Sequence, residues 1–203
     1  MNIAVIGATG NAGSRIVDEL LRRNHTVTGI ARNPSSLNGR AGVTPKKGDV
    51  FDRPGLAKLI EGHDAVVSAV HFLASDPALL IAAVKDAKAA RYLVVGGAGS
   101  LEVAPGVTLV STPNFPAQYK AEAEKGGVFL GLLQQETVLN WTFLSPSALL
   151  IPGDRTGTFR LGTDQLLTAA DGKSSISLED YAVALVDEIE KPAHIRRRFT
   201  VGY

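Results

Sequence analysis

The segment that most constrains the fold of this chain is Gly7-Ala8-Thr9-Gly10-Asn11-Ala12-Gly13, which lies between the apolar run 3–6 and the helical pattern 12–23. At this spacing Gly7 permits a tight turn, Gly10 lets the backbone approach a pyrophosphate, and Gly13 lets the helix pack closely on the strand. The helix N-terminus adds free N–H groups and a positive dipole, and Thr9 and Asn11 can add side-chain donors. The segment therefore predicts a strand, turn and helix that bind a dinucleotide, with an ordinary tight turn as the alternative.

The rest of the chain alternates short apolar runs with helical patterns, as βαβ units around a parallel sheet do. Strands are predicted at 3–6, 26–31, 44–47, 65–70, 92–95 and 141–144. Helices are predicted to begin at Ala12, Asp52, Asp76-Pro77 and Pro116, and to end near 23, 60, 90 and 136. The predicted fold class is α/β, with a Rossmann-type doubly wound parallel sheet.

The pattern changes after Pro146, where glycines separate short extended pieces. The elements predicted there are extended pieces at 158–161 and 165–168, a capping box at Ser177-Leu178-Glu179-Asp180, a helix that ends at Pro192 and a last strand at 199–201. The chain has no linker long enough to separate two domains. We expect residues 1–203 to form a single NAD(P)-binding domain, in which 146–203 supply a small C-terminal cap on the substrate side and the last helix and strand.

The composition and charge of the chain narrow the classes of partner. Its 21 basic residues nearly cancel its 20 acidic ones, so the net charge of +1 supplies no field that attracts nucleic acid or an anionic membrane. The absence of cysteine excludes disulfides, thiolate nucleophiles and cysteine-ligated zinc, and the carboxylates and histidines lack the spacing of a metal site. No apolar run approaches the roughly 20 residues of a membrane span, and the N-terminus does not resemble a signal peptide. We expect a cytoplasmic monomer or homodimer that acts on a small molecule and holds no metal.

The end of the second predicted strand indicates which nicotinamide cofactor binds. NAD-selective domains place an acidic residue about 20 positions beyond the last glycine, where it accepts hydrogen bonds from the ribose 2′-hydroxyl. In this chain Arg32 and Asn33 occupy those positions, 19 and 20 residues after Gly13. A guanidinium group can pair with a 2′-phosphate, whereas a carboxylate would repel it. We predict NADP(H), with NAD(H) possible and a solvated Arg32 as the alternative.

Other polar residues have weaker positional support. Asp49-Val50 follow the third predicted strand, where an adenine contact is usual in this architecture, although Asp49 could instead cap a turn. Arg155 and Arg160 in the predicted cap could meet a phosphate or carboxylate of the substrate, with solvated surface charges as the alternative.

These motifs resemble the short-chain dehydrogenase/reductase superfamily, specifically its small atypical members: the NmrA-like group and the NADH-flavin or biliverdin-IXβ reductase-like proteins. Besides the glycine-rich loop, the resemblance rests on Gly62-His63-Asp64-Ala65-Val66-Val67-Ser68-Ala69, Val94-Val95-Gly96-Gly97-Ala98-Gly99-Ser100 and Ser177-Leu178-Glu179-Asp180-Tyr181-Ala182. It implies that Ser68, Ala69 and Val70 pass beside the cofactor ribose. It also implies that residues 96–100, which include Gly96, Gly97 and Ser100, lie beneath the nicotinamide and the substrate.

The chain departs from the family pattern at the catalytic tyrosine. Members that reduce carbonyl groups use Tyr-x-x-x-Lys, in which the tyrosine protonates the developing alkoxide and the lysine lowers the tyrosine pKa. Lys120 resembles that lysine, yet Pro116 stands four positions before it and Tyr119 is its direct neighbour. Neighbours on a helix point about 100° apart, so the two cannot address one ribose and one carbonyl in the usual way. Either Tyr119 acts from a non-helical turn, or the reaction needs no acid, as in hydride transfer to an oxidised flavin.

Two further side chains complete the set of catalytic candidates, which is Lys120, Tyr119, Ser100 and His71. His71 follows the fourth predicted strand and could face the nicotinamide as a proton donor or flavin contact. Ser100 could replace the serine of the family. A loop histidine without a catalytic role and a serine in a turn are the alternatives.

Together these features predict an NADP(H)-dependent oxidoreductase of the atypical short-chain type. It would transfer a hydride to a flavin such as FMN or FAD, a quinone or a similar planar acceptor. The first alternative is a non-catalytic NADP(H)-binding protein that senses redox state. The second is an enzyme like the sugar-nucleotide epimerases and dehydratases.

Overall fold

The computed structural model describes all 203 residues, and its centre is an eight-stranded sheet in the order β10-β12-β8-β5-β4-β1-β2-β3. The strands are β1 (Asn2–Ile6), β2 (Thr26–Ala31), β3 (Val43–Lys47), β4 (Ala65–Ser68), β5 (Tyr92–Val95), β8 (Trp141–Ser145), β10 (Arg160–Gly162) and β12 (Arg197–Gly202). Neighbouring strands are parallel except for β10, which pairs antiparallel with β12 at the edge. The order runs outward in both directions from β1, so the predicted Rossmann-type doubly wound sheet is confirmed.

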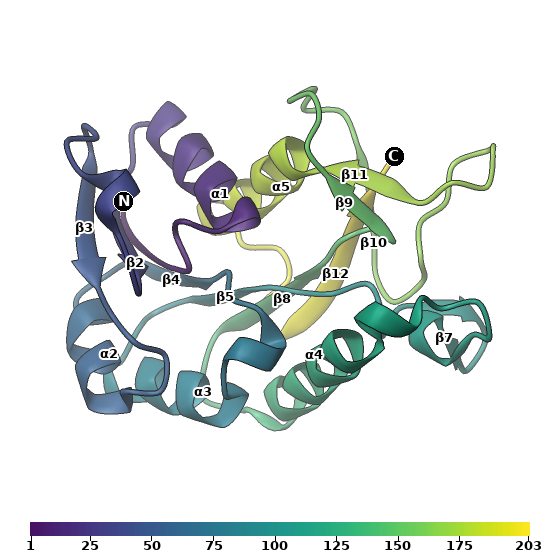
Figure 1. Cartoon of the computed structure of the whole chain (residues 1–203), viewed down its shortest axis with the longest axis horizontal. Helices are drawn as coiled ribbons and strands as arrows, with labels where there is room; N and C mark the ends of the chain where they lie inside the picture. Colours follow the sequence, from purple (N-terminus) through teal and green to yellow (C-terminus); the bar gives the residue numbers. More distant parts are fainter.

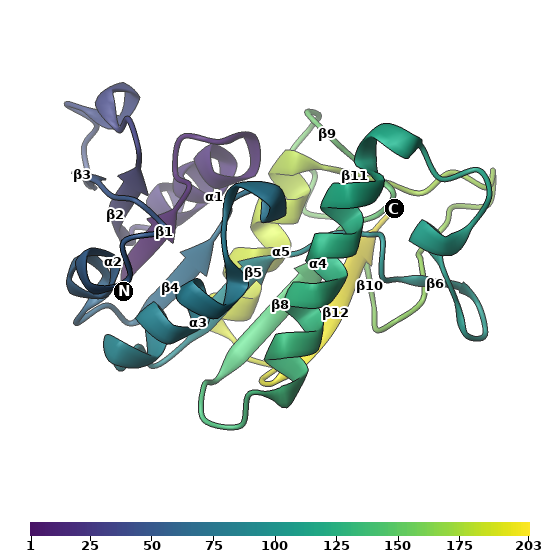
Figure 2. The same cartoon turned by 60° about the horizontal axis from the view of Figure 1, so that its bottom comes forward.

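Helices cover both faces of this sheet, as Figure 1 and Figure 2 show. The helices α1 (Asn11–Arg22) and α5 (Leu178–Glu190) pack on one face, and α2 (Arg53–Ile60), α3 (Pro77–Asp86) and α4 (Ala117–Gln135) pack on the other. In β1, Ile3 and Val5 enter the core under α1 and α5, whereas Ala4 and Ile6 enter the core on the opposite face. Alternate residues of a strand point to opposite faces, so an entirely apolar strand has to be covered on both sides. None of these helices combines the length and the apolar character needed to cross a membrane.

Side-chain caps fix where the predicted helices begin. Asp76 accepts hydrogen bonds from the first-turn N–H groups of α3 at 2.8 and 3.1 Å. The Ser177 hydroxyl oxygen accepts one from the Asp180 N–H at 2.9 Å at the start of α5. The predicted capping box is only half formed, because the Asp180 carboxylate accepts hydrogen bonds from Thr156 and Gly157 instead.

Several predicted boundaries shift. The fourth strand ends at Ser68 instead of 70, and α3 ends at Asp86 instead of near 90, just before Lys88 takes a positive φ of 52°. Of the two extended pieces predicted after Pro146, the first overlaps β10 (Arg160–Gly162), whereas 165–168 forms no strand and only Gln165 makes an isolated bridge.

Two small sheets were not predicted. One joins β6 (Glu102–Ala104) to β7 (Val107–Thr108), and the other joins β9 (Leu149–Ile151) in parallel to β11 (Ser175–Ser177). Strands of two or three residues are too short to carry a readable alternation. The second of these sheets lies beside α5, so the region after 146 folds back toward the carboxyl edge of the large sheet (Figure 1).

Candidate functional site

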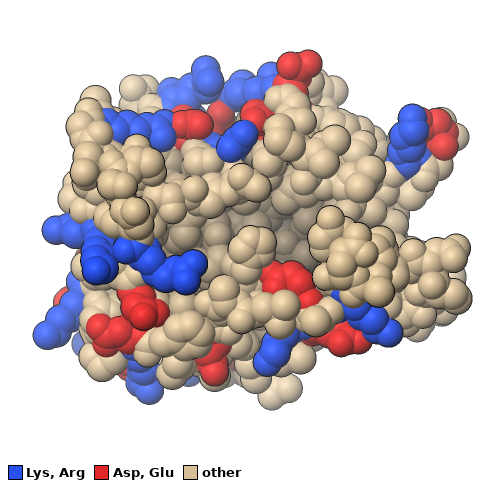
Figure 3. Space-filling model, in the orientation of Figure 1, with Lys and Arg blue, Asp and Glu red and all other residues tan.

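A cleft of about 540 Å³ lies at the carboxyl edge of the large sheet, and Figure 3 shows it as a hollow across one face of the molecule. Its lining residues come from the ends of β1, β2 and β5, from the loops that follow β1, β2, β3, β4 and β5, and from α4, α5 and the region of β9. The strand order reverses at β1, so the chain leaves β1 and β4 toward opposite faces of the sheet. Doubly wound folds bind their ligands in the crevice that forms at such a point.

The glycine-rich loop after β1 has no room for side chains at its first and third glycines. A Cβ atom on Gly7 would lie 2.4 Å from the carbonyl oxygen of Ala69, and Gly7 has a positive φ of 85°. A Cβ atom on Gly13 would lie 2.1 Å from the carbonyl oxygen of Gly7. Packing therefore requires these two glycines. Gly10 lines the cleft, so its missing side chain leaves the loop surface open to a ligand.

The first turn of α1 presents unpaired backbone N–H groups at the cleft. Gly10 occupies the N-cap position, no side chain caps the helix, and its first turn contains no acidic residue. The N–H groups of Asn11, Ala12 and Gly13 donate no hydrogen bond within the protein. Such groups, together with the helix dipole, bind phosphate oxygens. Thr9, Asn11 and Ala12 line the cleft, so this loop fits a pyrophosphate.

Basic side chains stand at the end of the cleft beside β2 and β3. Arg32 directly follows β2, is exposed, lines the cleft and joins none of the ion pairs of the structure. Lys47 pairs with Ala31 in the parallel ladder and is also exposed. Figure 3 shows basic side chains gathered on this side of the hollow. No carboxylate stands at the end of β2 to repel a phosphate there.

The other residues predicted for this end differ in placement. Asp49 and Val50 line the cleft, and the Asp49 carboxylate also accepts a hydrogen bond from the Phe51 N–H at 3.0 Å, so Asp49 does cap a turn. Asn33 does not line the cleft, and its side-chain oxygen accepts a hydrogen bond from the Ser35 N–H. Phe51, whose side chain lines the cleft, was not predicted.

The opposite end of the cleft lies at β4 and β5 and is largely apolar. Of the predicted ribose and nicotinamide contacts, Ala69, Val70 and Gly96 line it, whereas Ser68 and Gly97 do not. Ser68 is 2% exposed within β4. The wall of this end also contains apolar residues that were not predicted, among them Phe72, Val95, Leu150, Pro152 and Leu178. The last three belong to the predicted cap region, which the structure thus brings to the cleft.

Only one of the four catalytic candidates lines the cleft, and it is His71. Tyr119 and Lys120 are exposed in the first turn of α4 and do not line it. Tyr119 lies within the helix and not in the non-helical turn that the sequence left open. The Ser100 hydroxyl accepts a hydrogen bond from Arg198 at 3.3 Å, outside the cleft.

None of the four tyrosines of the chain lines the cleft. Tyr92 and Tyr181 are completely buried, and the Tyr181 hydroxyl donates a hydrogen bond to the carbonyl oxygen of Leu144 at 2.7 Å. Burial raises the pKa of Tyr181 above its ordinary value. The Tyr203 hydroxyl is occupied by Ser177 and Asp180. The cleft therefore contains no phenol that could protonate an alkoxide.

Glu122 in α4 is the one carboxylate at the apolar end, and the sequence analysis missed it. Its two oxygens accept hydrogen bonds from the N–H groups of Phe72 at 2.7 Å and Leu73 at 2.8 Å, and the Nδ1 atom of His71 lies 3.3 Å from one of them. Its partners are about 50 positions away in the sequence, so no local motif indicates the interaction. Glu122 ties the segment after β4 to α4.

Aromatic packing also fixes the segment after β4, through the ring of Phe72. Phe72 is 8% exposed and contacts Phe129 edge-on and Phe143 in a stacked arrangement, with ring centroids 6.1 and 6.4 Å apart. A Cβ atom on Gly126 would lie 2.7 Å from the Phe72 ring, so α4 approaches closely only because Gly126 has no side chain. The backbone beside His71 is therefore held on both sides.

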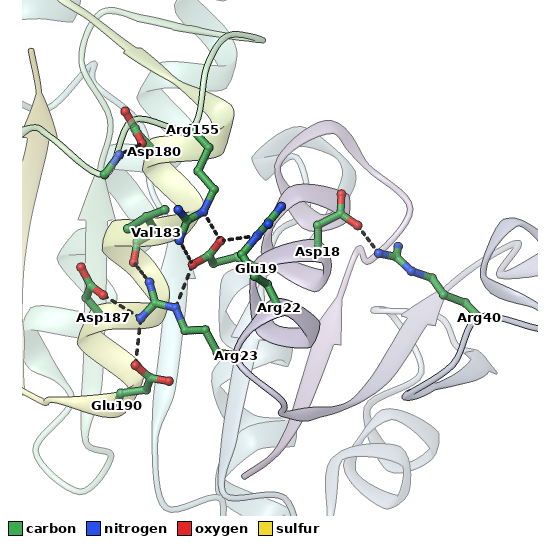
Figure 4. A network of polar contacts seen from close by, with 11 residues as sticks. Asp18, Glu19, Arg22, Arg23, Arg40, Arg155, Asp180, Val183, Asp187 and Glu190 are labelled. Carbon is green, nitrogen blue, oxygen red and sulfur yellow. Dashed lines mark hydrogen bonds and ion pairs between the residues drawn. The ribbon is translucent and has the colours of Figure 1, made fainter.

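The cap region is fastened to α1 and α5 by the polar network in Figure 4. Arg155 donates two hydrogen bonds of 2.7 Å to Glu19, which is 3% exposed and also binds Arg23 at 2.8 Å. Burial raises the pKa of Glu19, but the guanidinium groups of Arg155 and Arg23 together lower it by more. The net shift of the pKa is therefore downward. Arg160 donates hydrogen bonds to backbone oxygens of Thr168 and Tyr203. Both cap arginines are thus committed to contacts within the protein.

Comparison with known proteins adds relatives of the whole chain. The profile of the NAD(P)H-binding family matches residues 7–192. The chain is 44% identical to the uncharacterized protein YwnB of Bacillus subtilis, over 99% of this chain and 98% of that protein.

Solved structures match with similar coverage. A protein from Bacteroides thetaiotaomicron, provisionally named an epimerase, has a TM-score of 0.95 and 38% identity, covering 100% of this chain and 96% of that chain. A protein from Streptococcus pneumoniae, provisionally named an NADH-flavin reductase, has a TM-score of 0.83 and 37% identity, covering 100% of this chain and 99% of that chain. The names of these two relatives thus refer to different reactions, epimerisation and flavin reduction.

Proposed function

The chain belongs to the NAD(P)H-binding family, among the atypical short-chain dehydrogenases/reductases, and from this premise we propose that it is an NADP(H)-dependent reductase of planar acceptors. The acceptor would be a flavin, a quinone or a similar ring. The observation that carries the proposal is that an apolar cleft, into which no tyrosine reaches, adjoins the dinucleotide loop. The resemblance to the Streptococcus protein, whose provisional name is NADH-flavin reductase, supports the same reaction class.

The residues of the glycine-rich loop and Arg32 would bind the cofactor. The unpaired N–H groups of Asn11, Ala12 and Gly13 are suited to pyrophosphate oxygens, and the free guanidinium group of Arg32 is suited to a 2′-phosphate. Val50 and Phe51 offer apolar surface for an adenine. When bound, NADPH supplies the hydride.

The apolar end of the cleft would orient the acceptor and exclude water. A carbonyl substrate needs an acid that protonates its developing alkoxide. The tyrosine that serves as this acid in the family has no counterpart in the cleft, because no tyrosine lines it. A flavin or quinone ring delocalises the charge that arrives with the hydride, so positioning supplies most of the catalysis. His71, whose side chain is 88% exposed at this end, is the proposed ring contact or proton donor, while Lys120, Tyr119 and Ser100 have no proposed contact with the acceptor.

We also propose that residues 1–203 act as one NAD(P)-binding domain with 146–203 as its substrate-side cap. Leu150, Pro152 and Leu178 reach the cleft from that region. The small sheet of β9 and β11 and the anchors at Glu19 and Asp180 would keep them there.

Calorimetric titration and steady-state kinetics test this function together. We expect NADPH to bind more tightly than NADH, and NADPH to be oxidised with riboflavin, FMN or small quinones but not with simple ketones. Turnover of ketones alone would contradict the proposed acceptor class. Tight binding of NADPH without turnover of any acceptor would instead support a redox sensor, and isomerisation of a sugar nucleotide without net oxidation would support an epimerase.

A further inference from the structure

Three residues with a formal charge line the cleft. Arg32 and Asp49 lie at the end beside β2 and β3, where their charges are opposite, and Glu122 lies at the apolar end. No lysine or arginine lines the apolar end. Figure 3 shows acidic side chains at the α4 side of the hollow and basic ones at the β3 side, with charges of the other sign nearby on both sides.

Three arginines of the C-terminal region are already bound to other groups. Arg155 is paired with Glu19, Arg160 with two backbone oxygens, and Arg198 with Asp164. Lys120 is two positions before Glu122, and residues two apart on a helix point about 200° apart, so Lys120 faces away from the direction of Glu122. No lysine or arginine of the lining is therefore placed to pair with an anionic group that entered this end.

The carboxylate of Glu122 is fixed there by the fold. Backbone N–H groups of Phe72 and Leu73 hold both of its oxygens, so it cannot swing out of the cleft. Its side chain is 28% exposed, so part of the carboxylate remains accessible to a molecule bound in the cleft. The chain neighbours of the lining residues Phe72 and Leu150 include the exposed apolar side chains of Leu73, Leu149 and Ile151.

From this arrangement we infer that the acceptor is an uncharged planar molecule and that Glu122 rejects anionic acceptors. The inference rests on the proposed function, because it assigns a charge class to the acceptor of the same cleft. A neutral ring can be buried against the apolar wall at no electrostatic cost. A phosphorylated or sulfonated ring would bring its charge to within several ångströms of a carboxylate. At the intermediate dielectric of a partly exposed site, one such like-charge contact costs roughly a fivefold to tenfold loss of affinity.

Riboflavin and FMN provide the matched pair for the test, because they share one ring system and differ by a phosphate. With saturating NADPH we expect kcat/KM for riboflavin to exceed that for FMN by about fivefold or more. Replacement of Glu122 by glutamine removes the charge but keeps one acceptor oxygen, and we expect the ratio to move toward one. Added salt should lower the ratio in the wild type and leave it nearly unchanged in Glu122→Gln, since screening acts on charge and not on the loop anchor.

Equilibrium binding separates this inference from the proposed function. Flavin fluorescence reports the affinity of riboflavin and FMN for the protein loaded with NADP⁺, with no need for turnover. Tighter binding of riboflavin without any oxidation of NADPH would uphold the charge selection and overturn the proposed reaction. Equal or tighter binding of FMN, a ratio that Glu122→Gln leaves unchanged, or no binding of either flavin would overturn the inference.

Discussion

The Glu122 carboxylate in α4 accepts a hydrogen bond of 2.7 Å from the backbone N–H of Phe72, which lies 50 positions earlier in the chain. The second oxygen does the same for Leu73 at 2.8 Å. This contact joins the loop after β4 to the helix after β5. One side chain therefore sets both the shape and the charge of the apolar end of the cleft.

Removal of this anchor should loosen the loop. In Glu122→Ala two backbone donors lose a charged acceptor, which we expect to lower the free energy of unfolding by about 2 kcal/mol. Hydrogen exchange should show faster exchange at Phe72 and Leu73. Glu124→Ala is the control, because Glu124 lies on the same helix, is exposed and has no hydrogen-bond partner within the protein. Equal protection of the two amides in both variants would contradict the anchoring role.

Arg32 should set the preference for NADPH. In Arg32→Ala we expect the Kd for NADPH to rise by tenfold or more, since a charged hydrogen bond contributes about 1.5–3 kcal/mol. The Kd for NADH should change less than twofold, because NADH has no 2′-phosphate. Calorimetry measures both constants. Arg197→Ala, an exposed arginine at the start of β12, is the control for a general loss of positive charge. A similar loss of affinity for both cofactors would argue against contact with the 2′-phosphate.

The sequence predicted the sheet and the glycine-rich loop that follows β1, because their signals are local. Apolar runs, caps such as Asp76 and the spacing of Gly7, Gly10 and Gly13 all act within a few residues of the chain. The resemblance to atypical short-chain reductases rested on the same local motifs and is confirmed by the family match.

The apolar end of the cleft was poorly predicted because its contacts are distant in sequence. Glu122 binds residues 72 and 73, and Leu150 and Leu178 arrive from a region whose short strands have no readable period. Ser100 was a catalytic candidate in the sequence, yet in the structure its hydroxyl accepts a hydrogen bond from Arg198 outside the cleft. A motif indicates the residue types present, but tertiary packing decides which of them face the cleft.

The third glycine of the loop should tolerate no side chain. In Gly13→Ala the new methyl group would lie 2.1 Å from a backbone oxygen of Gly7, so the start of α1 has to move away from β1. We expect a clear drop in Tm and loss of NADPH binding. Gly127→Ala is the matched control, because a Cβ atom there meets nothing within 4 Å and alanine favours a helix by about 1 kcal/mol. A Tm for Gly13→Ala at or above that of the wild type would contradict the steric argument.

The Tyr119 hydroxyl should be dispensable. It lies on an exposed side chain outside the cleft, so Tyr119→Phe is expected to keep kcat/KM for NADPH oxidation within about twofold of the wild type. Stopped-flow or steady-state absorbance at the NADPH band measures the rate. A tenfold fall with an unchanged Tm would show that the phenol reaches the reaction, and it would favour carbonyl chemistry.

The anchor of the cap at Glu19 should make stability depend on pH in a defined direction. The guanidinium groups of Arg155 and Arg23 hold the pKa of Glu19 below the ordinary value of 4.5 in the folded protein. A carboxyl group with a lowered pKa stabilises the fold above its unfolded-state pKa, and this stabilisation disappears as the pH falls through the folded-state value. We expect Glu19→Gln to lower the free energy of unfolding by about 2 kcal/mol at pH 7, and the difference from the wild type to shrink as the pH falls below 4.5. Denaturant titrations at several pH values measure the difference, from which the carboxyl groups shared by both proteins cancel.

Asp18→Asn is the control for this prediction, because Asp18 is a more exposed neighbouring carboxylate. It should cost less than about 1 kcal/mol at any pH. A difference between Glu19→Gln and the wild type that grows toward low pH would contradict the lowered pKa.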